Sequence, residues 1–268
     1  MNRIITFITF SLAAIAISAQ KADIEVSYVA HHPNMRDGKT DLTNQYILLA
    51  NATESKFFSP VTEYIDSMKS TPDGAAKLRE MTLTAFNAGK IDDIPKPDGS
   101  IYVRKSLADG KVTYYDNAGP EKFFYEEPSA QWDWAMGDST KVILGYECMI
   151  ATTDYHGRKW TAWFSPEIPV QNGPWKLDGL PGLILEAEAE GGQYSFVATG
   201  LQETTKSIGP VYSASEYERT NRMDFLKYNR SYMDNPDGKL NAIFGVSTDG
   251  TLKFVPAEVA DFLETDYH

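Results

Sequence analysis

Apolar and polar residues alternate along much of this chain, which is the pattern of half-buried β-strands. The clearest case is residues 183–190, where leucine and alanine occupy one face and glutamate recurs on the other. Gly191 and Gly192 then turn the chain into the next predicted strand. A strand with one acidic face is typical of an antiparallel sheet that has one face in solvent.

Turn signals such as Asp109-Gly110 and His156-Gly157 separate pairs of further strands and predict hairpins. The predicted strands cover residues 24–29, 45–50, 101–104, 112–115, 147–153, 159–165, 183–190, 193–199, 242–246 and 251–255. Because neighbouring strands are joined by short local connections, we expect a mainly antiparallel sheet.

Two stretches have apolar residues at helical spacing instead. Residues 60–89 predict two short helices separated by a turn at 72–74. Residues 213–233 predict a further helix, with Ser215 and Glu218 matching a capping box near its start. We therefore expect an α+β, mainly β fold: a single domain whose curved antiparallel sheet is covered by two short helical stretches. A half-barrel is favoured over a sandwich because the helices need an apolar sheet face to cover.

The first 19 residues have the features of a secretory signal peptide. Arg3 precedes a nearly continuous apolar run that ends at small residues, and cleavage is expected after Ala19 or Gln20. The run is shorter than the ~20 residues of a membrane-spanning helix, and no second run of that length follows in the sequence. We therefore expect residues 1–19 to be a signal peptide and residues 20–268 to form one β-rich domain of an exported, soluble protein without a transmembrane span.

Charge and cysteine content narrow the function classes. The 268 residues include 25 Lys and Arg against 37 Asp and Glu, a formal net charge of −12, and no basic stripe offsets this balance. A nucleic-acid partner is therefore not expected. Cys148 is the single cysteine, which excludes an intramolecular disulfide, a zinc ribbon and an iron–sulfur cluster. We expect no cofactor.

Tryptophan is concentrated in one part of the chain. All five tryptophans lie between positions 132 and 175, and this stretch leads into an apolar loop at 173–182 that is rich in glycine and proline. We expect a rigid, packed loop, because glycine permits unusual backbone angles and proline stiffens the chain. The residues expected to shape this loop are Gly173, Pro174, Gly179 and Gly182.

The same stretch resembles the GLPGLI family of exported Bacteroidetes proteins. The hexapeptide that names the family stands unbroken at 179–184, and similar flanking patterns occur at 143–148, 157–164 and 173–175. The resemblance covers about residues 132–201. It implies a protein of the periplasm or of the periplasmic face of the outer membrane. It implies no catalytic residue, since the family has no established activity.

Aromatic and loop residues of this stretch are the candidate contact surface for a ligand or partner. Tryptophan offers a large flat apolar face with one N–H donor, which suits a sugar, a peptide or a lipid. Trp160 and Trp163 are three positions apart in a predicted strand, so they fall on opposite faces. The alternative is that the rings fill the core and the loop is a structural turn. The candidate binding residues are Trp160, Trp163, Trp175, Leu180 and Pro181.

Cys148 and His156 are secondary candidates for chemistry. His156 lies in the turn after the strand of Cys148, so the two offer a nucleophile with a base or, by residue type, ligands for copper or zinc. The alternative, which we favour, is a buried small apolar residue and a turn histidine. His31 and His32 follow the first predicted strand, where we expect an exposed polar loop.

These features favour an exported, non-enzymatic binding or interaction protein of the bacterial envelope. Its 173–182 loop would contact a ligand or a protein partner in the periplasm or the outer membrane. Three alternatives stay open: a periplasmic carrier that holds an apolar ligand on the concave sheet face, a hydrolase with an unrecognised site, and a copper- or zinc-binding protein.

Overall fold

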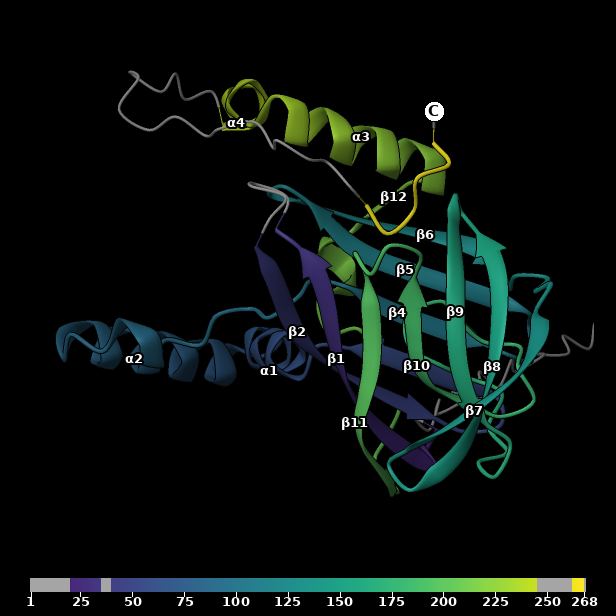
Figure 1. The fold of residues 1–268 in the computed structure, drawn as a ribbon. Helices are drawn as coiled ribbons and strands as arrows, with labels where there is room; N and C mark the ends of the chain where they lie inside the picture. Colours follow the sequence, from purple (N-terminus) through teal and green to yellow (C-terminus); the bar gives the residue numbers. More distant parts are fainter. Residues whose placement is uncertain (1–19, 35–39, 245–261, 268) are drawn as a thin grey trace, which may run out of the picture.

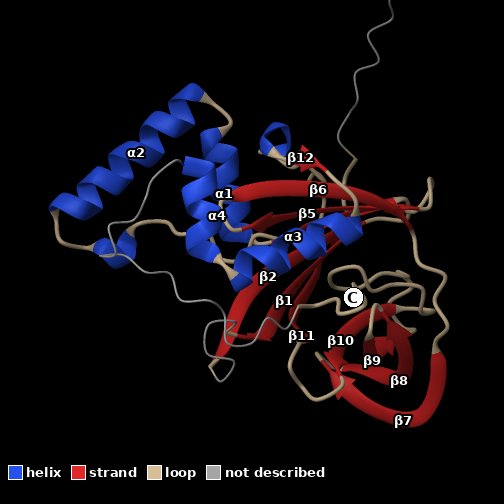
Figure 2. Cartoon of the chain, turned by 90° about the horizontal axis from the view of Figure 1, so that it is seen from above, coloured by secondary structure: helices blue, strands red, loops and turns tan. Residues whose placement is uncertain are grey.

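The computed structural model describes residues 20–34, 40–244 and 262–267, and within them twelve strands form one sheet (Figure 1). The strands are β1 (Ile24–Pro33), β2 (Asp41–Ala50), β3 (Glu54–Phe58), β4 (Tyr102–Ser106), β5 (Lys111–Ala118), β6 (Glu121–Pro128), β7 (Ala135–Ile143), β8 (Tyr146–Tyr155), β9 (Arg158–Ser165), β10 (Leu183–Ala189), β11 (Ser195–Glu203) and β12 (Glu218–Arg219). Their order across the sheet is β12-β6-β5-β4-β3-β2-β1-β11-β10-β9-β8-β7. Every pairing is antiparallel except the short one between β12 and β6. The sheet is open and strongly curved, which confirms the predicted mainly β fold and selects the half-barrel over the sandwich (Figure 2).

Alternating side chains build separate apolar layers on the two faces of this sheet. Leu48 and Phe57 belong to the large core on the inner, concave face. Their neighbours Leu49 and Phe58 belong to a smaller cluster on the outer face. Because both faces are covered here, the central strands carry apolar runs rather than a strict alternation.

The helices cover different parts of the sheet. They are α1 (Pro60–Lys69), α2 (Pro72–Asn87), α3 (Arg222–Asp234) and α4 (Pro236–Phe244), with 3-10 turns η1 (Ile91–Asp93) and η2 (Ala214–Glu216). The α3 helix places Phe225 and Leu226 in the inner core. On the outer face, Asp66 of α1 accepts a hydrogen bond from the Tyr102 hydroxyl at 2.8 Å. The α2 helix packs mainly on α1 and extends away from the sheet (Figure 1).

The helix predicted at 213–233 begins later in the structure, at the start of α3. Asn221 caps it with its side chain, and the capping box predicted at Ser215 does not form. Tyr217 accounts for the difference, because it is buried in the outer cluster and the residues after it are extended as β12. Burial of one aromatic side chain overrides the local capping pattern.

Residues 60–89 contain two helices, as predicted, but residues 72–74 begin the second helix rather than separate the two. The Thr71 hydroxyl accepts a hydrogen bond from the Gly74 amide at 3.2 Å and caps α2. Pro72 occupies the first helical turn, where its missing N–H leaves no bond unmade.

Three further differences concern strands. Residues 242–244, predicted as strand, belong to α4, whose start is capped by Asn235 accepting from the Gly238 amide at 3.0 Å. His31 and His32 lie within β1 rather than in a loop. The pattern did not predict β3, β6 or β7.

The signal peptide predicted at 1–19 and the rest of the last predicted hairpin lie outside the described residues. In the part of the chain that the structure describes, no helix combines the length and the apolar content needed to cross a bilayer.

Candidate ligand-binding cavity

The loop at 173–182 is packed into the inner core. Leu180 at its tip is 1% exposed. Lys105 of β4 is equally buried, and its ammonium donates hydrogen bonds to the carbonyl oxygens of Leu177 (2.7 Å) and Gly173 (3.3 Å). A buried cation that is satisfied by loop carbonyls fixes the loop against the sheet.

Two tryptophans hold the same loop from its other side. The rings of Trp132 and Trp134 stack with centroids 5.4 Å apart. The Trp132 indole N–H donates to the Asp178 carboxylate, and that of Trp134 donates to the Asp178 carbonyl oxygen at 2.9 Å. The loop is therefore a fixed part of the core, and of its shaping residues Gly173, Pro174 and Gly182 are buried while Gly179 is exposed.

The five candidate contact residues do not form one surface. Trp160 and Trp175 lie together in the inner core, 5.6 Å apart and each 0% exposed. Trp163 is half-buried and, by alternation along β9, lies on the face opposite Trp160. Pro181 is exposed. A docking partner could therefore reach only Pro181 and one edge of Trp163, whereas Trp175 borders an internal cavity.

Cys148 and His156 are not brought together. They sit at opposite ends of β8, and eight residues of extended chain span about 26 Å. Cys148 is fully buried, and this burial raises the pKa of its thiol. His156 Nδ1 instead lies 3.0 Å from a carboxylate oxygen of Asp266.

His156, Glu264 and Asp266 offer ligand atoms that all lie within 4.8 Å of one another, which by residue type could hold a metal ion. However, the Arg222 guanidinium already pairs with both carboxylates. This cluster is therefore a set of ion pairs in which Arg222 already occupies the carboxylate oxygens that a metal ion would need.

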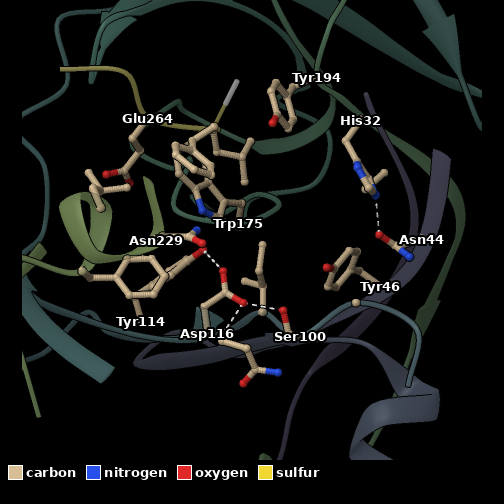
Figure 3. A pocket seen from close by; sticks show the side chains of 18 of the residues that line it. His32, Asn44, Tyr46, Ser100, Tyr114, Asp116, Trp175, Tyr194, Asn229 and Glu264 are labelled. Carbon is tan, nitrogen blue, oxygen red and sulfur yellow. Dashed lines mark hydrogen bonds between the residues drawn. The ribbon is translucent and has the colours of Figure 1, made fainter. Parts of the chain in front are cut away.

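A cavity of about 240 Å³ lies on the inner face of the sheet, beneath α3 and the segment at 262–264 (Figure 3). Its aromatic lining residues are Tyr46, Tyr114, Tyr125, Trp175, Tyr194, Phe196, Phe225 and Phe262. Its polar and titratable lining residues are His31, His32, Asn44, Ser100, Asp116, Asn117, Asn229 and Glu264. The lining comes from strands on both arms of the half-barrel, so the curvature of the sheet itself creates the space.

Asp116 is the central polar group of one wall (Figure 3). Its carboxylate accepts hydrogen bonds from the Ser100 hydroxyl, from the Tyr114 hydroxyl at 2.9 Å and from the backbone N–H of Asn117 at 2.7 Å. Burial raises the pKa of this carboxyl, and the three hydrogen bonds act in the opposite direction. All three donors are neutral groups.

Three buried polar atoms of the wall have no hydrogen-bond partner among the described residues. These are the side-chain oxygens of Asn117 and Asn229 and the indole N–H of Trp175. Asn229 is 9% exposed and Trp175 0% exposed. An unpaired buried polar group costs about 1–3 kcal/mol, so such groups at a cavity wall are suited to a bound molecule or water.

Glu264, the second carboxylate of the lining, pairs with two cations of the protein. Its oxygens pair with the ammonium of Lys176 at 2.6 Å and with the guanidinium of Arg222. Although burial opposes ionisation, these two cations keep the pKa of Glu264 below its usual value. The cavity thus has one carboxylate that is paired with cations and one, Asp116, that is held by neutral donors alone.

The sequence analysis singled out Trp175 and named His31 and His32 only as part of an exposed polar loop, and it missed Asp116 and Asn229. Asp116 and Asn229 are separated by more than a hundred residues, and no local pattern links them. The predicted strand at 112–115 ends one residue before Asp116, whereas β5 continues through it although aspartate is depleted in strands.

Comparison with known protein families gives one short match. A family described as "Protein of unknown function (Porph_ging)" matches residues 155–186, which span β9, the packed loop and the first half of β10. No curated protein matches the chain.

Comparison with solved structures gives similar folds at low sequence identity. The structure of PNGF-II in a C2 space group has a TM-score of 0.50 and 14% identity, covering 78% of this chain and 32% of that chain. The P21 form of PNGF-II has a TM-score of 0.48 and 15% identity, covering 77% and 33% of the two chains. The complex of MucB with MucA(peri) has a TM-score of 0.31 and 10% identity, covering 69% and 51%. This chain spans about a third of the PNGF-II chains, and the likeness concerns the β-rich fold alone.

Proposed function

We propose that this protein is a binding protein that holds a small, mainly apolar molecule in the cavity between the inner sheet face and α3. One observation carries the proposal: an aromatic cavity whose wall contains buried polar atoms that no described residue satisfies. Ligand sites combine these features, with apolar walls for affinity and a few polar groups for orientation.

The size of the cavity limits the ligand. Its volume of about 240 Å³ is slightly below the usual range of ligand pockets, about 300–1,000 Å³. A molecule with one ring and a short substituent, or one end of a longer molecule, would fill it. Binding through the 173–182 loop itself is less well supported, because Trp175 and Leu180 are buried.

We further propose that the protein is an exported member of the GLPGLI family, in the periplasm or at the periplasmic face of the outer membrane. The unbroken hexapeptide at 179–184 and the leader-like residues 1–19 support this placement. N-terminal sequencing of the protein from a cell envelope should begin at Gln20 or Lys21. A chain that still began at Met1 would contradict export by cleavage.

The binding proposal is tested by native mass spectrometry of the protein purified from its own envelope. We expect a small molecule that co-purifies at a ratio of one to one. Ala30 is 5% exposed and lines the cavity, so Ala30→Phe would fill part of the space and should release that molecule.

Ala135→Phe makes the same change at an exposed position of β7 and serves as the control. It should leave the co-purified molecule in place. Absence of any bound molecule, or its equal retention by the two variants, would contradict the proposal.

A further inference from the structure

We infer that the cavity binds an organic cation, with an ammonium group against Asp116 and an apolar body against Trp175 and Tyr46. This inference rests on the proposed function and adds the charge of the ligand. It follows from how the charges and hydrogen-bonding groups of the cavity wall are distributed.

The first step concerns the charge of Asp116. Among the ion pairs of the described residues, none includes this carboxylate, and no lysine or arginine lines the cavity. Glu264 in the same wall shows the contrast, because it pairs with two cations of the protein. Asp116 is half-buried, and a carboxylate partly withdrawn from water without a counter-ion carries a desolvation cost that a bound cation would reduce.

The second step concerns the other titratable groups that face the cavity. His32 Nε2 lies 2.7 Å from the side-chain oxygen of Asn44. The side-chain NH2 group of Asn44 donates to the Asp98 carboxylate at 2.5 Å. Burial is the main cause that raises the pKa of Tyr46, and the negative charges of Asp116 and Asp98 add to it, which places two carboxylates near its hydroxyl. The electrostatic environment on this side of the cavity therefore favours a positive ligand.

The third step concerns hydrogen-bonding capacity. Among the unpartnered buried atoms of the wall, two are acceptors, the side-chain oxygens of Asn117 and Asn229, and one is a donor, the Trp175 indole N–H. The Asp116 carboxylate accepts three hydrogen bonds, which leaves one of its roughly four lone-pair positions for a ligand. A primary ammonium has three N–H donors and no acceptor, so it matches this excess. A carboxylate or phosphate ligand would face acceptors and an aspartate, which is unfavourable.

The fourth step concerns the aromatic wall. The Lys176 ammonium already lies over the rings of Tyr125 (4.8 Å), Tyr114 (5.0 Å) and Trp175 (5.6 Å). The same group of rings therefore stabilises one cation within the protein, and Lys176 itself is balanced by Glu127 and Glu264, each at 2.6 Å. Aromatic faces attract cationic ligands in the same way, and aromatic cages recur in sites that bind ammonium groups.

The inference is tested with three probes of similar size that share a phenyl ring and differ in charge: 2-phenylethylammonium, 2-phenylethanol and phenylacetate. Binding to the purified full chain is measured by calorimetry and by tryptophan fluorescence, since Trp175 lines the cavity. We expect the ammonium to bind at least about tenfold more tightly than the alcohol, and phenylacetate to bind most weakly. This comparison uses the unmodified protein and does not depend on a variant folding.

Asp116→Asn removes the charge while keeping the shape, and it should bring the ammonium down to the affinity of the alcohol. Asp109→Asn makes the same change in the exposed turn before β5 and should leave the preference intact. Thermal melting establishes that both variants are folded. If Asp116→Asn does not fold, the inference is judged from the unmodified protein alone, by whether it binds the ammonium probe more tightly than the alcohol.

Three results would overturn the inference: equal binding of ammonium and alcohol, tighter binding of phenylacetate, or no binding of any probe. They are distinguishable from failure of the proposed function. A neutral or anionic molecule that co-purifies with the protein and is displaced by Ala30→Phe would sustain the binding function while contradicting a cationic ligand.

Discussion

The ammonium of Lys176 lies 2.6 Å from a carboxylate oxygen of Glu264, although the two residues are 88 positions apart in the chain. Both side chains are buried, with exposures of 1% and 4%. Lys176 belongs to the packed loop and Glu264 to the segment at 262–267. This ion pair therefore holds the segment that closes one side of the cavity against the core of the half-barrel.

Glu264→Gln should destabilise the protein, because it removes a buried charge on which both Lys176 and Arg222 depend. We expect a loss of about 2–3 kcal/mol in the free energy of unfolding, less than for an isolated buried pair, since Glu127 remains within 2.6 Å of Lys176. Urea denaturation measures the change. Glu80→Gln, at an exposed position of α2, should shift stability by less than about 0.5 kcal/mol, and equal effects of the two would refute the structural role of the pair.

Gly182→Ala should be strongly destabilising. Gly182 has a φ of 157°, and a β-carbon at this position would overlap the carbonyl oxygen of Ser165 on the neighbouring strand. The backbone would have to move, at a cost of about 2–4 kcal/mol. Gly110→Ala is the matched control, since Gly110 also has a positive φ, 59°, but has nothing within 4 Å of an added β-carbon. In thermal melting, Gly182→Ala should melt at a clearly lower temperature than Gly110→Ala. A melting temperature for Gly182→Ala at or above that of Gly110→Ala would count against the packed loop.

The sequence indicated this packed loop correctly, because glycine, proline and large apolar residues in one short segment constrain the backbone locally. It also indicated the strand at 183–190, where the alternation is regular and β10 shows the expected burial on one face. Local information was insufficient where a distant contact decides the structure. Tyr217 is an example: it packs in the outer cluster, and the two residues after it form β12 although the sequence predicted a helix there. The cavity could not be predicted for the same reason, since Asp116, Trp175 and Asn229 meet only after the sheet has curved.

Lys105 should make stability depend on pH in the alkaline range. Burial lowers the pKa of this ammonium to about 8, although the Asp178 carboxylate 3.7 Å away acts in the opposite direction. Between about pH 8 and the ordinary lysine value near 10.4, the unfolded chain holds a proton that the folded protein has released. The contribution of Lys105 to the free energy of unfolding therefore rises with pH in this window, by at most about 1.4 kcal/mol per pH unit.

The measurement for Lys105 is urea denaturation of the unmodified protein and of Lys105→Met between pH 7.5 and about 9.5, below the range where tyrosines titrate. The stability difference between the two should grow in favour of the unmodified protein as pH rises. Lys77→Met, at an exposed position of α2, should show a difference that is independent of pH. A Lys105 difference that stays constant or shrinks would show that this ammonium keeps its ordinary pKa.

Cys148 should be unreactive in the folded protein. Its side chain is fully buried in the inner core, burial raises the pKa of the thiol, and His156 at the far end of β8 cannot act as its base. Iodoacetamide at pH 8 should therefore modify the native chain far more slowly than the chain unfolded in guanidinium, as followed by intact mass. The double variant Cys148→Ala, Met149→Cys moves the thiol by one residue, to a position that is 36% exposed, and should be modified rapidly while folded. Because this is the chain's single cysteine, rapid labelling of the unmodified native protein would place a reactive thiol on the surface and reopen a nucleophilic role for Cys148.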